Sequence, residues 1–150
     1  MSTLPQYGKR LHPSATMRAV VIDRYGPPDE LRPTSVPQPV PGRGQVLVRV
    51  RFIGVNPKDL MVRKGNFKAL TGRHFPLIVG HDIAGEVLEA APGAGLAPGE
   101  RVFGMINDLA GRAYAEYAAV DAGQLARAPA SIDLRAAAAV PLAAQTALQA

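Results

Sequence analysis

Two short polar clusters in the sequence have side chains that could do chemistry. The first is Asn56-Pro57-Lys58-Asp59, and the second is Gly80-His81-Asp82, which lies between apolar segments. An asparagine amide can donate and accept hydrogen bonds, a histidine can gain or lose a proton near neutral pH, and an ionised aspartate accepts hydrogen bonds. Structural roles explain the same residues more simply. Asn56 can cap a helix whose positive N-terminus favours Asp59, and His81 can be a hydrogen-bonded, half-buried histidine.

Several other kinds of site find no support in the sequence. A catalytic zinc needs about three protein ligands, and the chain has no cysteine that could join His81 in binding one. No serine lies in a Gly-x-Ser-x-Gly elbow. The pairs Gly42-Arg43-Gly44 and Gly93-Ala94-Gly95 lack the third glycine of a phosphate-binding loop, so each is interpreted as a turn.

The elements that must position the two clusters are mostly short strands. The β-branched segment 17–24 predicts a strand that ends at Tyr25-Gly26-Pro27-Pro28. Segment 45–55 alternates with the period of a half-buried strand, so one face is expected to hold Val46, Val48, Val50 and Phe52. A further strand is expected over residues 81–90, where Gly85 indicates a bulge or a close approach of the backbone.

Helices are expected at three places. Asn56-Pro57 predicts a capped helix over residues 58–64, which Gly65 ends. Alanine-rich segments near the end predict a capped helix over 131–139 and the start of another over 142–150. With 15 glycines and 14 prolines in 150 residues, short strands followed by terminal helices predict one mainly β domain, a small closed or nearly closed barrel.

The charge is unevenly distributed along the chain. Residues 1–75 contain 13 Lys and Arg against 4 Asp and Glu, whereas residues 76–150 contain 4 against 8. The basic residues are scattered over strands and turns without interleaved aromatics, which favours a solvated face over nucleic-acid binding. No apolar run is long enough to span a bilayer, and residues 1–16 are expected to be a flexible tail rather than a targeting peptide.

Taken together, the motifs resemble the N-terminal, GroES-like catalytic domain of the medium-chain dehydrogenase/reductase superfamily, in its zinc-independent quinone oxidoreductase-like branch. The resemblance covers nearly the whole chain from Met17 and depends on motifs in family order. These are Met17-Arg18-Ala19-Val20, Pro41-Gly42 with Gly44-Gln45-Val46-Leu47-Val48, Gly54-Val55-Asn56-Pro57 with Asp59, Gly80-His81-Asp82 with Ala84-Gly85, Pro98-Gly99-Glu100-Arg101-Val102-Phe103-Gly104, Ala113-Tyr114-Ala115-Glu116-Tyr117, and Ala138-Ala139-Val140-Pro141-Leu142 with Thr146-Ala147.

The resemblance implies a partly open β-barrel that forms one wall of a cleft. Family members bind NADPH or NADH in a Rossmann domain that follows, and reduce quinones, enones or related carbonyls by hydride transfer. Asn56 and Thr146 would correspond to residues that line the nicotinamide and substrate region, and are the candidate catalytic and cofactor-binding residues. Asp59, Met61 and His81 would line the substrate cleft, with Asp59 mainly structural.

Two comparisons with the family sharpen the expected chemistry. Zinc-dependent relatives have cysteine where Asn56 stands, keep a histidine like His81, and have a third ligand near the position of Leu142, which is apolar here. The resemblance therefore implies a zinc-free site in which hydrogen bonds polarise the substrate carbonyl. Several relatives have tyrosine at the position of Met61, and a thioether cannot donate a proton.

The leading hypothesis is the substrate-side domain of an NAD(P)H-dependent, zinc-free oxidoreductase. It comprises a tail (1–16), the GroES-like domain (17–140) and the start of a helix (141–150) toward a Rossmann domain that would act in cis or in trans. By itself the 150-residue chain is expected to be inactive. The expected location is cytoplasmic, with no nucleic-acid or membrane partner. The alternatives are a stand-alone, non-catalytic GroES-like binding module or remnant, and, more weakly, a GroES-type co-chaperonin.

Overall fold

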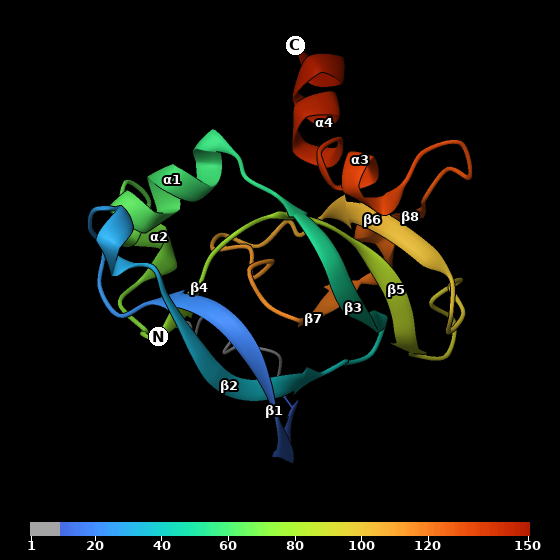
Figure 1. Cartoon of the computed structure of the whole chain (residues 1–150), viewed down its shortest axis with the longest axis horizontal. Coiled ribbons are helices and arrows are strands. Elements are labelled where there is room, and N and C mark those ends of the chain that lie inside the picture. Colours follow the sequence, from blue (N-terminus) through green and yellow to red (C-terminus); the bar gives the residue numbers. More distant parts are fainter. Residues whose placement is uncertain (1–9) are drawn as a thin grey trace.

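Two antiparallel sheets curve around a common core in the computed structural model, which describes residues 10–150 (Figure 1). The smaller sheet has the order β2 (Arg32–Val40), β1 (Arg10–Ile22), β4 (Leu77–Ile78). The larger has the order β7 (Tyr117–Asp121), β3 (Gln45–Gly54), β5 (Asp82–Ala90), β6 (Arg101–Met105), β8 (Leu125–Arg127). The sheets form a partly open barrel, which confirms the mainly β fold.

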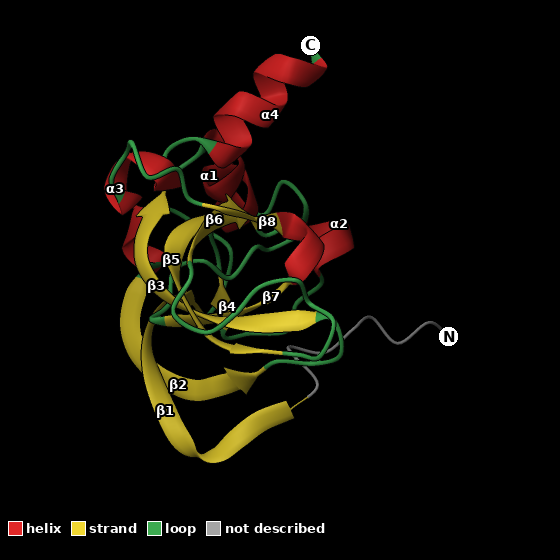
Figure 2. Ribbon diagram, turned by 90° about the vertical axis from the view of Figure 1, so that its right-hand side faces the viewer, coloured by secondary structure: helices red, strands yellow, loops and turns green. Residues whose placement is uncertain are grey.

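Short helices lie beside the sheets. The α-helices are α1 (Pro57–Lys64), α2 (Lys68–Thr71), α3 (Leu134–Ala138) and α4 (Pro141–Gln149), and the 3-10 turns are η1 (Pro28–Glu30) and η2 (Ala122–Gln124). Helices α3 and α4 adjoin each other, and α4 extends away from the strands to the C-terminal end of the chain (Figures 1 and 2). Within residues 10–150, no helix has both the length and the apolar composition needed to cross a bilayer.

The segment just before β7 connects the two sheets. The N–H of Val20 in β1 donates to the carbonyl of Tyr114 at 2.8 Å, and the N–H of Glu116 donates to the carbonyl of Arg18 at 3.0 Å. On the other side, the N–H of Val50 in β3 donates to the carbonyl of Glu116 at 2.9 Å. Residues 114–116 thus satisfy backbone groups of both sheets and fix their relative position.

The main core cluster lies on the larger sheet and the segments beside it, and consists mainly of β-branched side chains. Valines recur because they fit a pleated surface that is buried on the inner face. Fully or almost fully buried members of the main cluster include Val46, Val48, Ile83, Val87, Val102 and Val120.

Strand β1 begins earlier than the sequence pattern predicts. It starts at Arg10 rather than Met17, because Arg10 and Leu11 pair with Val40 and Pro39 of β2 across a register irregularity. Residues 10–16, which the sequence pattern assigns to the N-terminal tail, are part of β1 here, and residues 1–9 lie outside the described part of the chain.

The predicted alternation of β3 is wrong: Val46, Leu47 and Val48 are all buried, and Phe52 and Ile53 are both exposed. Phe52 is 36% exposed, with Arg135 stacked over its ring at 5.5 Å. The pairing of β3 with β5 changes register between Val50 and Phe52, opposite Gly85. Gly85 is predicted to mark a bulge or a close approach of the backbone, and both are found: the irregularity lies opposite it in β3, and a Cβ on Gly85 would be 2.1 Å from the carbonyl oxygen of Arg49.

The helix predictions are right in place and differ at their boundaries. Helix α1 begins at Pro57 and ends at Gly65, as expected. The helix expected over 131–139 is shorter, because Asp133 rather than Ser131 provides the cap: its carboxylate accepts from the N–H of Ala136 at 2.7 Å. The last helix begins at Pro141, the residue before its expected start.

A methyl group at Gly85 should destabilise the domain strongly. A Cβ there would lie 2.1 Å from the carbonyl oxygen of Arg49, and both groups belong to paired strands. We expect Gly85→Ala to lower the free energy of unfolding by about 1–3 kcal/mol or more, as overpacking does. Gly123→Ala is the matched control, because a Cβ at Gly123 meets no atom within 4 Å. Urea unfolding of both variants checks this, and equal effects would contradict it.

Candidate active site

Asn56 lies between β3 and α1, and its backbone and its side chain each donate a hydrogen bond to a different aspartate. Its backbone N–H donates to Oδ2 of Asp59 at 2.9 Å, the carboxylate half of a capping box. Its side-chain Nδ2 donates to Oδ2 of Asp82 at 3.0 Å. The predicted helix cap is confirmed, and the side chain in addition joins the second polar cluster.

Asp59 is the centre of the buried part of this site. Its side chain is only 2% exposed, and besides Asn56 it meets Nδ1 of His81 at 2.5 Å and the hydroxyl of Tyr114 at 3.3 Å. A buried carboxylate is stable only with such partners. The three groups come from the start of α1, the start of β5 and the segment before β7, so Asp59 connects three parts of the chain.

Asp82 is completely buried and connects a further element to the site. Its carboxylate accepts from the backbone N–H of Leu142, in the first turn of α4, at 3.1 Å to Oδ2 and 3.2 Å to Oδ1. Burial raises the pKa of the Asp82 carboxyl, while the hydrogen bonds from Leu142 and Asn56 act in the opposite direction.

Tyr114 is a member of the site that sequence reasoning missed as a functional candidate. Burial, and then the neighbouring Asp59 charge, raise the pKa of the Tyr114 hydroxyl well above its usual value, so it stays protonated and donates to Asp59. The separation of 55 residues explains the omission: no local pattern links Tyr114 to Asp59, and only the barrel brings them together.

His81 is fully buried rather than half-buried as expected. Its Nε2 has no hydrogen-bond partner among the described residues, while its Nδ1 faces Asp59. Residues 10–150 contain no group of three or more His, Asp or Glu side chains placed to hold a metal, and the sequence has no cysteine. The Asn56 amide is turned to Asp82 rather than to His81.

The other two predicted site residues, Met61 and Thr146, are more exposed to solvent. Met61 is on α1 and 45% exposed, and Thr146 is exposed on α4, where its hydroxyl donates to the carbonyl of Leu142 at 2.8 Å. The structure therefore brings Asn56, Asp59 and His81 together in direct contact. Thr146 is connected to them only through α4 and Asp82.

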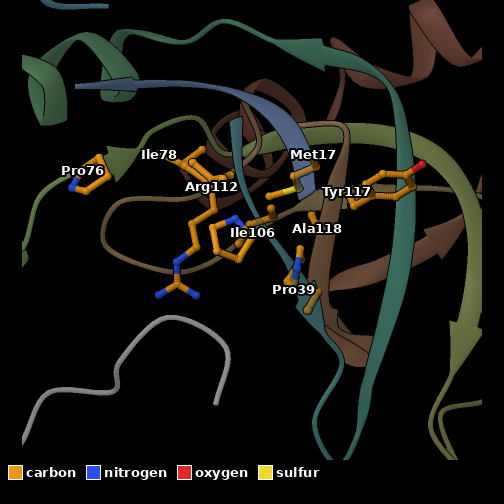
Figure 3. A pocket seen from close by; sticks show the side chains of 11 residues that line it. Met17, Pro39, Pro76, Ile78, Ile106, Arg112, Tyr117 and Ala118 are labelled. Carbon is orange, nitrogen blue, oxygen red and sulfur yellow. The ribbon is translucent and has the colours of Figure 1, made fainter. Parts of the chain in front are cut away.

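An apolar pocket lies elsewhere. Figure 3 shows a pocket of about 260 Å³ whose walls come from β1, β2, β4, β7 and the loop before β7. None of the predicted site residues lines it. Because hydrogen-bond chemistry needs polar groups and this cavity is almost wholly apolar, we place the candidate active site at the polar cluster. The pocket is lined by Met17, Val36, Pro37, Pro39, Pro76, Ile78, Ile106, Arg112, Tyr117, Ala118 and Ala119.

Comparison with known families identifies the class of the chain. Residues 42–130 match the alcohol dehydrogenase GroES-like domain, so the chain belongs to this family. It is the GroES-like region of the medium-chain dehydrogenase/reductase superfamily, as its motifs predict.

Curated relatives in this superfamily are oxidoreductases. The chain is 33% identical over 136 residues to a chloroplastic quinone-oxidoreductase homolog of Spinacia oleracea, covering 89% of this chain and 41% of the relative. It is 34% identical over 139 residues to a chloroplastic NADPH-dependent alkenal/one oxidoreductase of Arabidopsis thaliana, covering 87% and 36%. The chain thus spans about two fifths of the length of these relatives.

Solved structures agree on the fold. The quinone oxidoreductase of Coxiella burnetii superimposes with a TM-score of 0.84 at 29% identity, over 90% of this chain and 44% of the other. A cobalt- and zinc-bound thermostable alcohol dehydrogenase of Pyrobaculum aerophilum gives 0.77 at 31% identity, over 89% and 47%. The same barrel therefore occurs in proteins with and without a metal in their descriptions.

Removing the Asp59 carboxylate should be far more costly than removing a surface acid. Asp59→Ala leaves His81 and Tyr114 buried with unpaired polar atoms, so we expect a loss of about 3–5 kcal/mol in the free energy of unfolding. Glu86→Ala removes the exposed ion pair with Arg51, 3.0 Å long, and should cost no more than about 1 kcal/mol. Chemical denaturation compares the two, and similar losses would show that Asp59 is not structurally central.

Proposed function

We propose that this chain is the substrate-side domain of an NAD(P)H-dependent, zinc-free oxidoreductase that reduces a quinone, an enone or a related carbonyl compound. The nicotinamide cofactor would be held mainly by a Rossmann domain supplied in cis or in trans. The observation that carries the proposal is Asn56, whose half-buried amide is held in one orientation by Asp82 at the junction of β3 and α1. The family membership and the oxidoreductase relatives support it.

The chemistry assigned to Asn56 is stabilisation of negative charge. When bound, the reduced nicotinamide supplies a hydride, and the substrate oxygen gains negative charge as its carbon skeleton accepts that hydride. An amide nitrogen has two N–H bonds, and one of them accounts for the hydrogen bond to Asp82. The second N–H is the donor that would hold the substrate oxygen, in place of a metal.

Other residues would act around this donor. Thr146, on the exposed side of α4, would contact the nicotinamide or the substrate together with Asn56. Met61 would offer an apolar, adaptable surface at the cleft. Asp59 and His81 are buried, so we assign them to holding the start of α1 and of β5 beneath the site rather than to touching substrate.

The composition of helix α4 supports the proposal that another domain packs against it. Over Pro141–Gln149 it has no charged residue, and Leu148 is 86% exposed. An uncharged helix that extends from the barrel with an exposed leucine is typical of a surface that another domain covers. A stand-alone binding module would have less reason to keep this helix apolar.

The proposal also includes a zinc-free site, no nucleic-acid or membrane partner, and a cytoplasmic location. The absence of cysteine in the sequence supports a site without a thiolate-bound zinc, and elemental analysis showing about one zinc per chain would contradict it. Within the part of the chain that the structure describes, six arginines form ion pairs with acidic side chains, which supports a solvated basic surface rather than nucleic-acid binding. We propose a cytoplasmic location with no membrane partner; localisation of a tagged protein tests it.

The 150-residue chain alone should bind NADPH poorly. It offers the nicotinamide end of the cofactor two side chains, Asn56 and Thr146, and no glycine-rich loop for the phosphates. Isothermal titration calorimetry of the chain with NADPH should therefore show no binding at micromolar concentrations. Micromolar affinity would overturn this part of the proposal, and reading the gene beyond codon 150 tests whether a Rossmann domain follows.

The role of Asn56 is testable in the assembly with the Rossmann domain. Removing a donor that stabilises an oxyanion costs about 100-fold in rate, so Asn56→Ala should lower kcat/KM for an enone by that order. Asp133→Ala is the matched control, because it removes a helix cap, on α3, without touching the site. If both variants keep the same activity, Asn56 is not the donor.

A further inference from the structure

The carboxylate of Asp82 joins the two parts of the chain that carry the proposed catalytic residues. It accepts from the side-chain nitrogen of Asn56 at 3.0 Å and from the backbone N–H of Leu142 at 3.1 and 3.2 Å. Asn56 begins α1, and Leu142 is in the first turn of α4, 60 residues from Asp82 in sequence. One buried side chain therefore holds both helix starts.

The barrel fixes Asp82 firmly enough for this role. Its backbone pairs with Gly54 of β3 on one side and with Met105 of β6 on the other. Its side chain lies against Gly54, where an added Cβ would be 2.9 Å from Cβ of Asp82, 3.2 Å from its Oδ2 and 2.6 Å from the carbonyl of Ala138. The absence of a side chain at Gly54 thus creates the space that the carboxylate occupies.

The direction of these hydrogen bonds determines how the Asn56 amide and the start of α4 are oriented. A carboxylate can only accept, so the Asn56 amide must turn its nitrogen, and not its oxygen, toward Asp82. On the other side, Pro141 has no N–H, which makes Leu142 the first residue of α4 that can donate. The carbonyl of Leu142 accepts from the Thr146 hydroxyl at 2.8 Å, so the same peptide segment connects Asp82 to Thr146.

We propose that Asp82 is a positioning residue that sets the orientation of the Asn56 amide and the placement of α4, and thereby the spacing between Asn56 and Thr146. Its meaning for catalysis rests on the proposed function, but the coupling itself is a property of this chain. Asp82 touches neither substrate nor cofactor in this role, because it is completely buried.

The coupling can be measured without cofactor or substrate, by NMR of the 150-residue chain. Asp82→Asn makes the acceptor neutral, so the amide hydrogen of Leu142 should exchange with solvent about 10-fold faster. The side-chain NH₂ resonances of Asn56 and the backbone amide of Thr146 should shift in the same variant. Asp121→Asn is the matched control, because Asp121 also accepts from a side-chain amide, Nε2 of Gln45 at 3.0 Å, but on the surface.

A swap of the two side chains separates positioning from general stability. In the double variant Asn56→Asp with Asp82→Asn, the new amide can donate to the new carboxylate while its oxygen accepts from Leu142. We expect slow exchange at Leu142 to return, even if Asp82→Asn alone does not fold. An unchanged Leu142 rate in Asp82→Asn, an equal effect in Asp121→Asn, or a swap that restores nothing would overturn the proposal. Because none of these measurements involves activity, failure of the oxidoreductase assignment would leave their outcome interpretable.

Discussion

Two carboxylates buried at one end of the barrel, Asp59 and Asp82, constrain the rest of the structure. A charge removed from water is tolerated only where several donors reach it, and most of these donors come from residues distant in sequence. Asp59 obtains them from α1, from His81 at the start of β5 and from Tyr114 before β7. Asp82 obtains them from Asn56 and α4. Compensating two charges therefore requires both sheets and two helices to be in place.

The sheets supply the precision that these contacts need. The register of β3 against β5 places Gly54 beside Asp82, and the bulge opposite Gly85 allows the strand to bend before it reaches that point. The segment 114–116 hydrogen-bonds to both sheets, and this fixes the Tyr114 ring relative to Asp59. The hydrogen bonds that Asp59 and Asp82 receive from distant residues thus depend on strand register, in addition to the local capping box of α1.

How much of this can be predicted from sequence depends on the distance over which each interaction acts. Asn56-Pro57 and Gly65 specify α1 within ten residues, and Gly85 specifies a bulge through its own missing side chain, so both predictions are confirmed. The joint exposure of Phe52 and Ile53 depends on which other elements cover the second half of β3, and an alternating pattern within one strand cannot show this. The donors Tyr114 and Leu142 are 55 and 60 residues from the carboxylates that they meet, beyond any local signal.

The two carboxylates also divide the candidate site into an inner and an outer part. Asp59, with His81 and Tyr114, is enclosed, and the raised pKa of Tyr114 keeps that hydroxyl a hydrogen-bond donor rather than a source of protons at neutral pH. Asp82 instead contacts the outer part of the site. It accepts hydrogen bonds from Asn56, which is half-buried, and from α4, most of which is exposed. A site with this division holds its outer groups in fixed orientations, and orientation is what a hydrogen-bond donor needs in order to stabilise charge without a metal.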